Sequence, residues 1–159
     1  MDTYLTFELK KEHFAVKVTN VLEVMQKKRI THVPKASDHV LGIINFRGNI
    51  LPVIDTYSKF NLSQPDDETK NVIIVLEIVI DEKIKEMAVV ADKVKDVIEI
   101  NQSEIQPLPE LGLSYNNDYI SGAINRDENF ILLLNIEKAF SDIDLDNKID
   151  IKSQQTETV

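Results

Sequence analysis

Cysteine is absent from this chain of 159 residues, and only four residues are glycine. The lack of cysteine excludes disulfides, thiol nucleophiles and cysteine-ligated zinc, and it is compatible with a reducing compartment. No stretch approaches the roughly 18 consecutive apolar residues of a membrane helix, and the first residues lack the basic and then apolar pattern of a signal peptide. We therefore expect a cytoplasmic protein with no direct membrane insertion.

Basic residues are also in short supply. The 18 Lys and Arg residues face 27 Asp and Glu residues, which gives a net charge of -9. Such a surface repels nucleic acid unless one face is locally basic. The single basic run, Lys27-Lys28-Arg29, has no interleaved aromatic side chains for base stacking, so we interpret it as a solvated loop and expect no nucleic-acid partner. Hydrophobic residues make up 43% of the chain, which is enough for a core.

Short apolar runs with the patterns of β-strands dominate the sequence. Residues 4–9 and 14–18 alternate apolar and polar side chains around a polar turn, which predicts a hairpin. Five further aliphatic runs are too short for ordinary helices. These runs are residues 50–54, 72–80, 87–91, 97–100 and 130–136. Helical signals are confined to 58–61, 103–105 and 136–140. The sequence therefore predicts a mainly β fold with a few short helices.

The two halves of the chain resemble each other. A shift of 80 places superposes residues 42–60 on 122–140 without a gap, so that Gly42 matches Gly122. The repeat predicts two related, intertwined β subdomains, the first centred on 15–70 and the second on 88–140. We expect them to form a single domain over 1–140, followed by an acidic and polar tail over 141–159. A cleft between two such subdomains is a common place for a binding site.

Two of the four glycines, Gly42 and Gly48, flank a segment that contains Arg47. We expect them to form the two corners of a bulged connection into a strand over 50–55. Pro52 cannot donate to a neighbouring strand, which predicts an edge position. A phosphate-binding loop is disfavoured, because the glycine spacing is wrong and a strand follows in place of a helix. Arg47 then either pairs with a nearby carboxylate or presents its guanidinium to a partner.

The order of these motifs resembles the CheW-like domains of bacterial chemotaxis. The matching segments are V-x-E-V (21–24), I-T-H-V-P (30–34), L-G-I-I-N-F-R-G-N-I-L-P-V-I-D (41–55), V-x-D-V-I-E-I (94–100), I-Q-P-L-P (105–109), Y-I-S-G-A-I-N (119–125) and F-I-L-L-L-N-I-E-K (130–138). The resemblance covers about residues 4–140 and implies two SH3-like, five-stranded β-barrels. It also implies a free-standing, non-enzymatic adaptor that joins chemoreceptors to the regulatory domain of a CheA-type histidine kinase in membrane-associated arrays.

The resemblance also assigns roles to residues of this chain. An aliphatic strip and an Arg47–Glu23 pair are implied to receive the helical tip of a receptor, which suits the docking of an amphipathic helix. The implied receptor-binding residues are Leu5, Val18, Val21, Glu23, Val24 and Arg47. The implied kinase-binding residues are Asn45, Phe46, Arg47 and Gly48. From the sequence alone, each valine taken singly is better explained as an ordinary core residue. Arg126-Asp127 departs from the R-G pattern, so we do not expect the second barrel to repeat these contacts.

No pattern in the sequence indicates catalysis. Serine does not occur in a G-x-S-x-G turn, and His13, His32 and His39 lack the spacing of metal ligands. We therefore expect no catalytic residue and no cofactor. Three other functions stay open at this point. They are a CheW-like adaptor of a different chemosensory array, a small-ligand sensor that uses the cleft, and an uncharacterised hydrolase.

One metal-like pattern occurs near the C-terminus. Asp142, Asp144 and Asp146 have the spacing of the first three ligands of a calcium loop. Asn147 then stands where the loop needs glycine, and Ser153 stands where it needs glutamate. We therefore expect a solvated acidic tail and no metal site.

Overall fold

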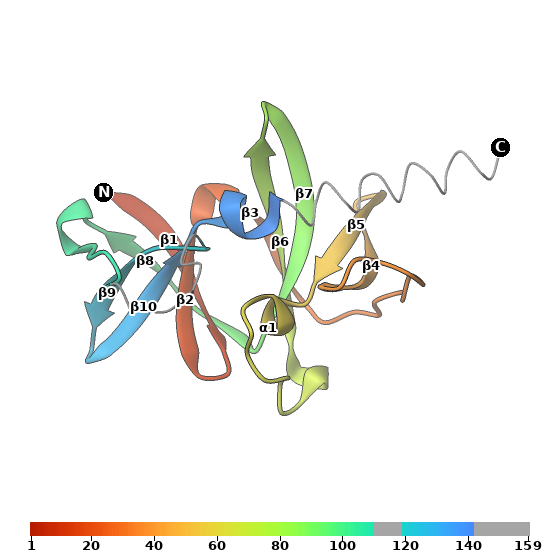
Figure 1. The fold of residues 1–159 in the computed structure, drawn as a ribbon, viewed down its shortest axis with the longest axis horizontal. Coiled ribbons are helices and arrows are strands. Elements are labelled where there is room, and N and C mark those ends of the chain that lie inside the picture. The colour runs from red at the N-terminus through yellow and green to blue at the C-terminus, as the bar shows by residue number, and fades with distance from the viewer. Residues whose placement is uncertain (110–118, 142–159) are drawn as a thin grey trace.

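The computed structural model describes residues 1–109 and 119–141 of the chain. Within these ranges, two five-stranded sheets lie side by side and account for most of the regular structure (Figure 1). The mainly β prediction is confirmed, as is the prediction of two subdomains.

One sheet combines the two ends of the described chain. Its strand order is β8-β1-β2-β10-β9. The strands are β1 (Asp2–Leu9), β2 (Glu12–Lys17), β8 (Lys93–Ile100), β9 (Ile120–Arg126) and β10 (Asn129–Leu134). β1 and β2 form the predicted antiparallel hairpin, and β10 pairs with β2 in parallel. The N-terminal hairpin therefore completes the barrel that the C-terminal half of the chain begins.

The other sheet is formed by the middle of the chain in the order β3-β6-β7-β5-β4. Its strands are β3 (Val21–Gln26), β4 (Val40–Phe46), β5 (Asn49–Ile54), β6 (Val72–Ile80) and β7 (Lys83–Ala91). The prediction of an edge position for Pro52 is wrong, because β5 lies between β4 and β7. A proline fits there because pairing with β7 begins only at Val53.

Each sheet is closed into a barrel by one short bridge between its two outer strands. In the middle-chain barrel, Thr31 and Ile43 exchange two backbone N–H···O hydrogen bonds of 2.9 Å. In the other barrel, Gln106 and Ala123 exchange two such bonds of 2.9 and 2.8 Å. These bridges join β3 to β4 and β8 to β9 by way of the segments that follow β3 and β8. The matched halves of the sequence thus make the same closure.

Glycine is required where these bridges form. A Cβ atom on Gly42 would lie 2.2 Å from the carbonyl oxygen of Thr31, and one on Gly122 would lie 2.7 Å from Cγ2 of Ile105. The prediction that Gly42 forms a corner is therefore wrong. It lies inside β4, and its lack of a side chain lets the bridging segment approach the strand.

Short helices follow the last strand of each hairpin. In α1 (Thr56–Lys59), the side chain of Asp55 accepts a hydrogen bond from the backbone N–H of Ser58. Asn135 accepts in the same way from the N–H of Lys138, and residues 136–141 are helical. The 3₁₀ turns are η1 (Val18–Asn20), η2 (Glu68–Lys70) and η3 (Gln102–Glu104). Asp or Asn at the N-cap satisfies backbone donors that would otherwise lack a partner.

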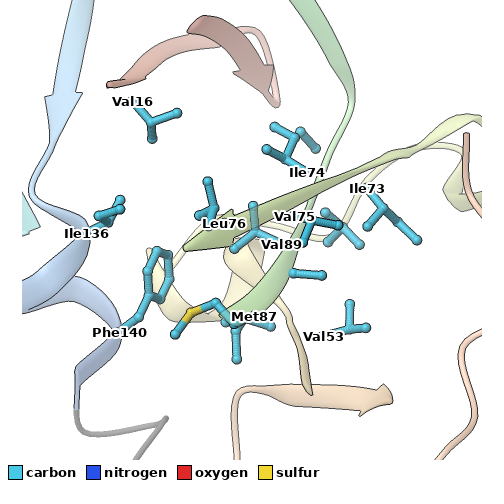
Figure 2. Close-up of a cluster of buried hydrophobic side chains, with 14 of the residues drawn as sticks. Val16, Val53, Ile73, Ile74, Val75, Leu76, Met87, Val89, Ile136 and Phe140 are labelled. Atoms are coloured by element: carbon cyan, nitrogen blue, oxygen red, sulfur yellow. The ribbon is translucent and has the colours of Figure 1, made fainter. Parts of the chain in front are cut away.

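The larger hydrophobic cluster extends from one barrel into the other. Figure 2 shows Ile136 and Phe140 of the C-terminal helix pointing toward Leu76 and Met87 of β6 and β7, and all four side chains are buried. A smaller cluster fills the barrel formed by the chain ends. It contains Tyr4, Ala15, Ile100, Ile124 and Leu133. The outer face of that barrel's sheet is therefore buried against its neighbour, which fixes the two barrels relative to each other.

Candidate docking surface

The turn between β4 and β5 holds the arginine that the sequence singled out. Arg47 and Gly48 both have positive φ, at 53° and 84°, which is the backbone of a tight two-residue hairpin. The Asn45 side-chain oxygen accepts a 3.1 Å hydrogen bond from the Gly48 N–H and braces the turn. Arg47 is therefore presented from an ordered hairpin tip, with 66% of its side chain exposed.

Arg47 makes two side-chain contacts with described residues. Its Nη2 atom lies 3.5 Å from Glu23 Oε1, and its guanidinium lies 4.8 Å from the ring centre of Phe46. Ion pairs this exposed contribute about 0–1 kcal/mol to stability. Arg47 can therefore exchange Glu23 for the carboxylate of a partner at little cost to the fold.

Glu23 and Val24 lie next to each other on β3, an outer strand of the middle-chain sheet. A bulge in β3 lies between Val21 and Glu23, where the register with β6 shifts. Bulges of this kind redirect the side chains that follow them. Val24 is 40% exposed, so it belongs to the surface and not to the core. The structure thus places Arg47 against Glu23 of β3, and the next residue of that strand, Val24, is exposed.

The other aliphatic residues of the predicted strip lie deeper. Leu5 on β1 is buried in the cluster between the barrels, and Val18 and Val21 are half-buried against that cluster. Val97 on β8 pairs directly with Leu5 and is 61% exposed. Val97 was not predicted as a site residue, because its sequence context is that of an ordinary alternating strand. The pairing with Leu5 extends the strip to the surface.

The four residues of the predicted kinase-facing turn differ in exposure. Asn45 and Gly48 are exposed with Arg47, whereas Phe46 is only 4% exposed. Phe46 can therefore contribute only by supporting Arg47 from below. Ile50 pairs with Asn45 across the hairpin and is 55% exposed. It was missed because it begins the apolar run of β5, and nothing in that run shows which side faces solvent.

The β9–β10 hairpin of the other barrel also exposes a large apolar side chain. Phe130 pairs with Asn125 as Ile50 pairs with Asn45, and its side chain is 58% exposed. Arg126 follows Asn125, but its Nη2 atom is held 3.0 Å from Glu104 Oε2 and also donates to the Glu99 carbonyl oxygen at 2.7 Å. The second arginine is therefore tied to its own barrel, unlike Arg47.

Two surface cavities have charged linings. One, of about 520 Å³, lies between the β1–β2 turn and the loop before β6, and Lys10 and Asp66 line it. The other, of about 260 Å³, lies beside Lys27 and Asp55. Neither of these two cavities is lined by the predicted aliphatic strip.

Among the described residues, no group of histidine and acidic side chains could hold a metal ion. The calcium-like pattern over 142–146 lies outside the described residues.

No described helix has both the length and the apolar character needed to cross a membrane.

The three histidines differ in exposure and in the groups that they contact. His32 is exposed, and His13 is half-buried on β2 with Nδ1 3.7 Å from Glu8 Oε1. His39 is also half-buried, and its Nδ1 lies 2.9 Å from the Ser58 hydroxyl.

Comparison with known proteins shows the family. The family model for the CheW-like domain matches residues 3–144, and the chain belongs to this family. Relatives are named chemotaxis protein CheW. The protein from Bacillus subtilis is 31% identical over 96% of this chain and 89% of its own length. The probable chemotaxis protein CheW of Rhizobium etli is 28% identical over 87% of this chain and 86% of its own length.

A solved structure agrees with this assignment. The scaffolding protein TtCheW from Thermoanaerobacter tengcongensis superposes with a TM-score of 0.76 and 27% sequence identity. The match covers 87% of this chain and 92% of that protein. The resemblance stated from the sequence motifs is therefore confirmed.

Proposed function

We propose that this protein is a non-enzymatic scaffold that couples chemoreceptors to the regulatory domain of a CheA-type histidine kinase. The observation that carries the proposal is the exposed Arg47 group, in which an ordered hairpin presents a weakly held guanidinium 3.5 Å from Glu23 of β3, the strand that also exposes Val24. The fold and the family support it, since a structurally similar relative is described as a scaffolding protein. We propose that it acts at the cytoplasmic side of receptor arrays, with residues 1–140 working as one domain.

The geometry supports two adjoining docking surfaces. The receptor tip would lie along β3 and the strip formed by Leu5, Val18 and Val21, with Val97 at its exposed end. The kinase would contact the hairpin tip through Asn45, Arg47 and Gly48, with Ile50 as an apolar anchor. Transient signalling interfaces commonly depend on a few apolar or arginine side chains. Arg47 lies where the two surfaces meet, so both partners would depend on it.

An Arg47→Glu variant tests this proposal. It places a carboxylate opposite Glu23 and replaces an attraction by a repulsion, while the exposure of both side chains keeps the effect on stability within about 1 kcal/mol. Lys83→Glu on the exposed end of β7 is the control, because it changes the net charge equally. We expect Arg47→Glu to weaken binding of the receptor's cytoplasmic fragment and of the kinase regulatory domain by about tenfold or more, measured by calorimetry.

The circular dichroism spectrum should be unchanged in both variants. If Arg47→Glu binds both partners as tightly as Lys83→Glu does, Arg47 has no part in either surface. If the wild-type protein binds neither partner from its own organism, the proposed function is wrong.

A further inference from the structure

A cluster of cations stands out against the acidic remainder of the molecule. Residues 27–47 contain five Lys or Arg residues and one Asp, a net charge of +4, which leaves -13 on the rest of a chain whose total is -9. From the sequence alone, the run Lys27-Lys28-Arg29 is interpreted as a solvated loop. The structure gives it a more specific position.

The closure of the middle-chain barrel carries this run to the Arg47 hairpin. The bridge between Thr31 and Ile43 holds the segment after β3 against β4. The Lys28 ammonium donates to the backbone carbonyl of Asn45, two residues before Arg47. We call Lys27, Lys28, Arg29 and Arg47 the basic ridge. Lys28 joins the run to the Arg47 hairpin, whereas Lys27 donates to the Glu68 carbonyl oxygen, and all three residues of the run line the cavity of about 260 Å³ beside Asp55.

Several cations outside the basic ridge form ion pairs with carboxylates. Elsewhere, Lys10 lies 2.8 Å from Asp66, Lys93 and Lys95 lie 3.6 and 3.4 Å from Glu8, and Arg126 lies 3.0 Å from Glu104. Within the described ranges, none of the three cations of the 27–29 run forms an ion pair with a carboxylate. Among the described residues, the acceptors of Lys27 and Lys28 are backbone carbonyls. Each ammonium carries three donors, so both keep capacity for an acidic partner.

We propose that the basic ridge binds the carboxylates of an acidic amphipathic helix whose apolar side covers Val24. Along an extended strand, alternate residues face the same way, so Val24, Gln26 and Lys28 follow one another on the outward side of β3 and its continuation. A helix lying along β3 would meet an apolar contact first and cations next. This inference rests on the proposed function for the source of the helix, which is the receptor tip.

The charge distribution favours a helix over larger polyanions. A membrane surface or a nucleic acid would also face the net charge of -13 on the rest of the chain, whereas a single helix can contact the ridge alone. Charges at the rim of an interface act mainly on the association rate and on its dependence on salt. The ridge should therefore accelerate docking at low ionic strength.

The test compares two triple variants of the full chain. In the ridge variant, Lys27, Lys28 and Arg29 are changed to glutamine. In the control variant, three exposed lysines on other elements, Lys11, Lys83 and Lys138, are changed to glutamine, which alters the net charge equally. Association with the cytoplasmic fragment of a receptor from the same organism is followed by stopped-flow fluorescence from about 0.01 M to about 1 M salt.

We expect the ridge variant to associate about tenfold more slowly than the control at low salt, and the difference to vanish at about 1 M. Equal rates for the two variants at low salt would show that the basic ridge does not bind the receptor helix, and would leave the proposed function intact. Failure of the wild-type protein to bind the fragment would overturn both. Vesicles containing about a third phosphatidylglycerol provide a further arm. Ridge-dependent binding to them, with equal rates for the receptor fragment, would assign the ridge to membranes instead.

Discussion

Substituting Gly42 by alanine is expected to open the seam of the middle-chain barrel. The added Cβ would lie 2.2 Å from the Thr31 oxygen, 2.8 Å from the Thr31 carbonyl carbon and 2.9 Å from Cγ2 of Ile30. Two of these three atoms belong to the backbone, so no change of rotamer relieves the contact. The bridging segment must move away from β4, and the two 2.9 Å hydrogen bonds between Thr31 and Ile43 are lost.

The magnitude follows from these two bonds. A backbone hydrogen bond contributes about 0.5–1.5 kcal/mol net, and a buried group left without a partner costs about 1–3 kcal/mol. Ile43 is half-buried, whereas Thr31 is exposed and its backbone groups can turn to water. We therefore expect Gly42→Ala to lower the free energy of unfolding by about 2–4 kcal/mol.

Gly48 and Gly122 provide controls, because a Cβ added at either position would make less severe contacts than one added at Gly42. A Cβ on Gly48 meets no heavy atom within 4 Å, so Gly48→Ala should cost only the left-handed backbone, about 1 kcal/mol. A Cβ on Gly122 would lie 2.7 Å from the Ile105 side chain and 3.1 Å from the Gln106 oxygen. The Ile105 side chain can yield, so Gly122→Ala should cost about 1–3 kcal/mol, as overpacking does.

Urea denaturation of the three variants, followed by circular dichroism, measures this series. The expected order of destabilisation is Gly42→Ala first, then Gly122→Ala, then Gly48→Ala, with similar dependence on urea concentration. If Gly42→Ala loses no more stability than Gly48→Ala does, the bridge is not what closes the barrel, and the reasoning is refuted.

Three further predictions concern a turn, a buried tyrosine and an exposed anchor. Changing Asp81-Glu82, which have φ of 51° and 64°, to Asn-Gly should stabilise the protein by about 1–2 kcal/mol in urea denaturation. Tyr57→Phe should cost about 1–3 kcal/mol, because the buried hydroxyl donates to the Asp92 carboxylate. Burial and that hydrogen bond raise the pKa of Tyr57 above 10.0, so wild-type stability should fall as the pH rises past that value, and Tyr57→Phe should remove this component. Ile50→Asp should weaken kinase binding about tenfold in calorimetry and leave stability unchanged.

For each of these three predictions, one result would contradict it. An unchanged or lower urea midpoint for Asn-Gly would mean that the turn carries no strain. An equal loss of stability above pH 10 in wild-type and Tyr57→Phe proteins would assign that loss to other groups. Kinase affinity that survives Ile50→Asp would place the kinase contact elsewhere.

The elements of the fold were predictable where local patterns decide the structure. Residues 72–80 and 87–91 are short aliphatic runs, and they lie in β6 and β7. β4 was missed because Gly42 and Asn45 suggest a turn. The need for Gly42 comes from Thr31, which is distant in sequence. The parallel pairing of β10 with β2 depends on tertiary contacts, so no local pattern showed that the N-terminal hairpin completes the C-terminal barrel.

The sequence motifs selected residues of the candidate site, but they did not show which of the side chains are exposed. The resemblance to the family selected Arg47 and Glu23, and the structure places them 3.5 Å apart. It also selected Leu5 and Phe46, whose side chains are buried, and it passed over Val97 and Ile50, whose side chains are exposed. Exposure depends on how the barrels pack against each other, which alternation within one strand does not show.

The central claim is that one molecule holds a receptor and a kinase at the same time. Sedimentation velocity on a mixture of this protein, a receptor cytoplasmic fragment and a kinase regulatory domain tests it most directly. We expect a species containing all three components that disappears when this protein is omitted or carries Arg47→Glu. The account would be contradicted if the kinase domain displaced the receptor fragment, so that only two-component complexes formed.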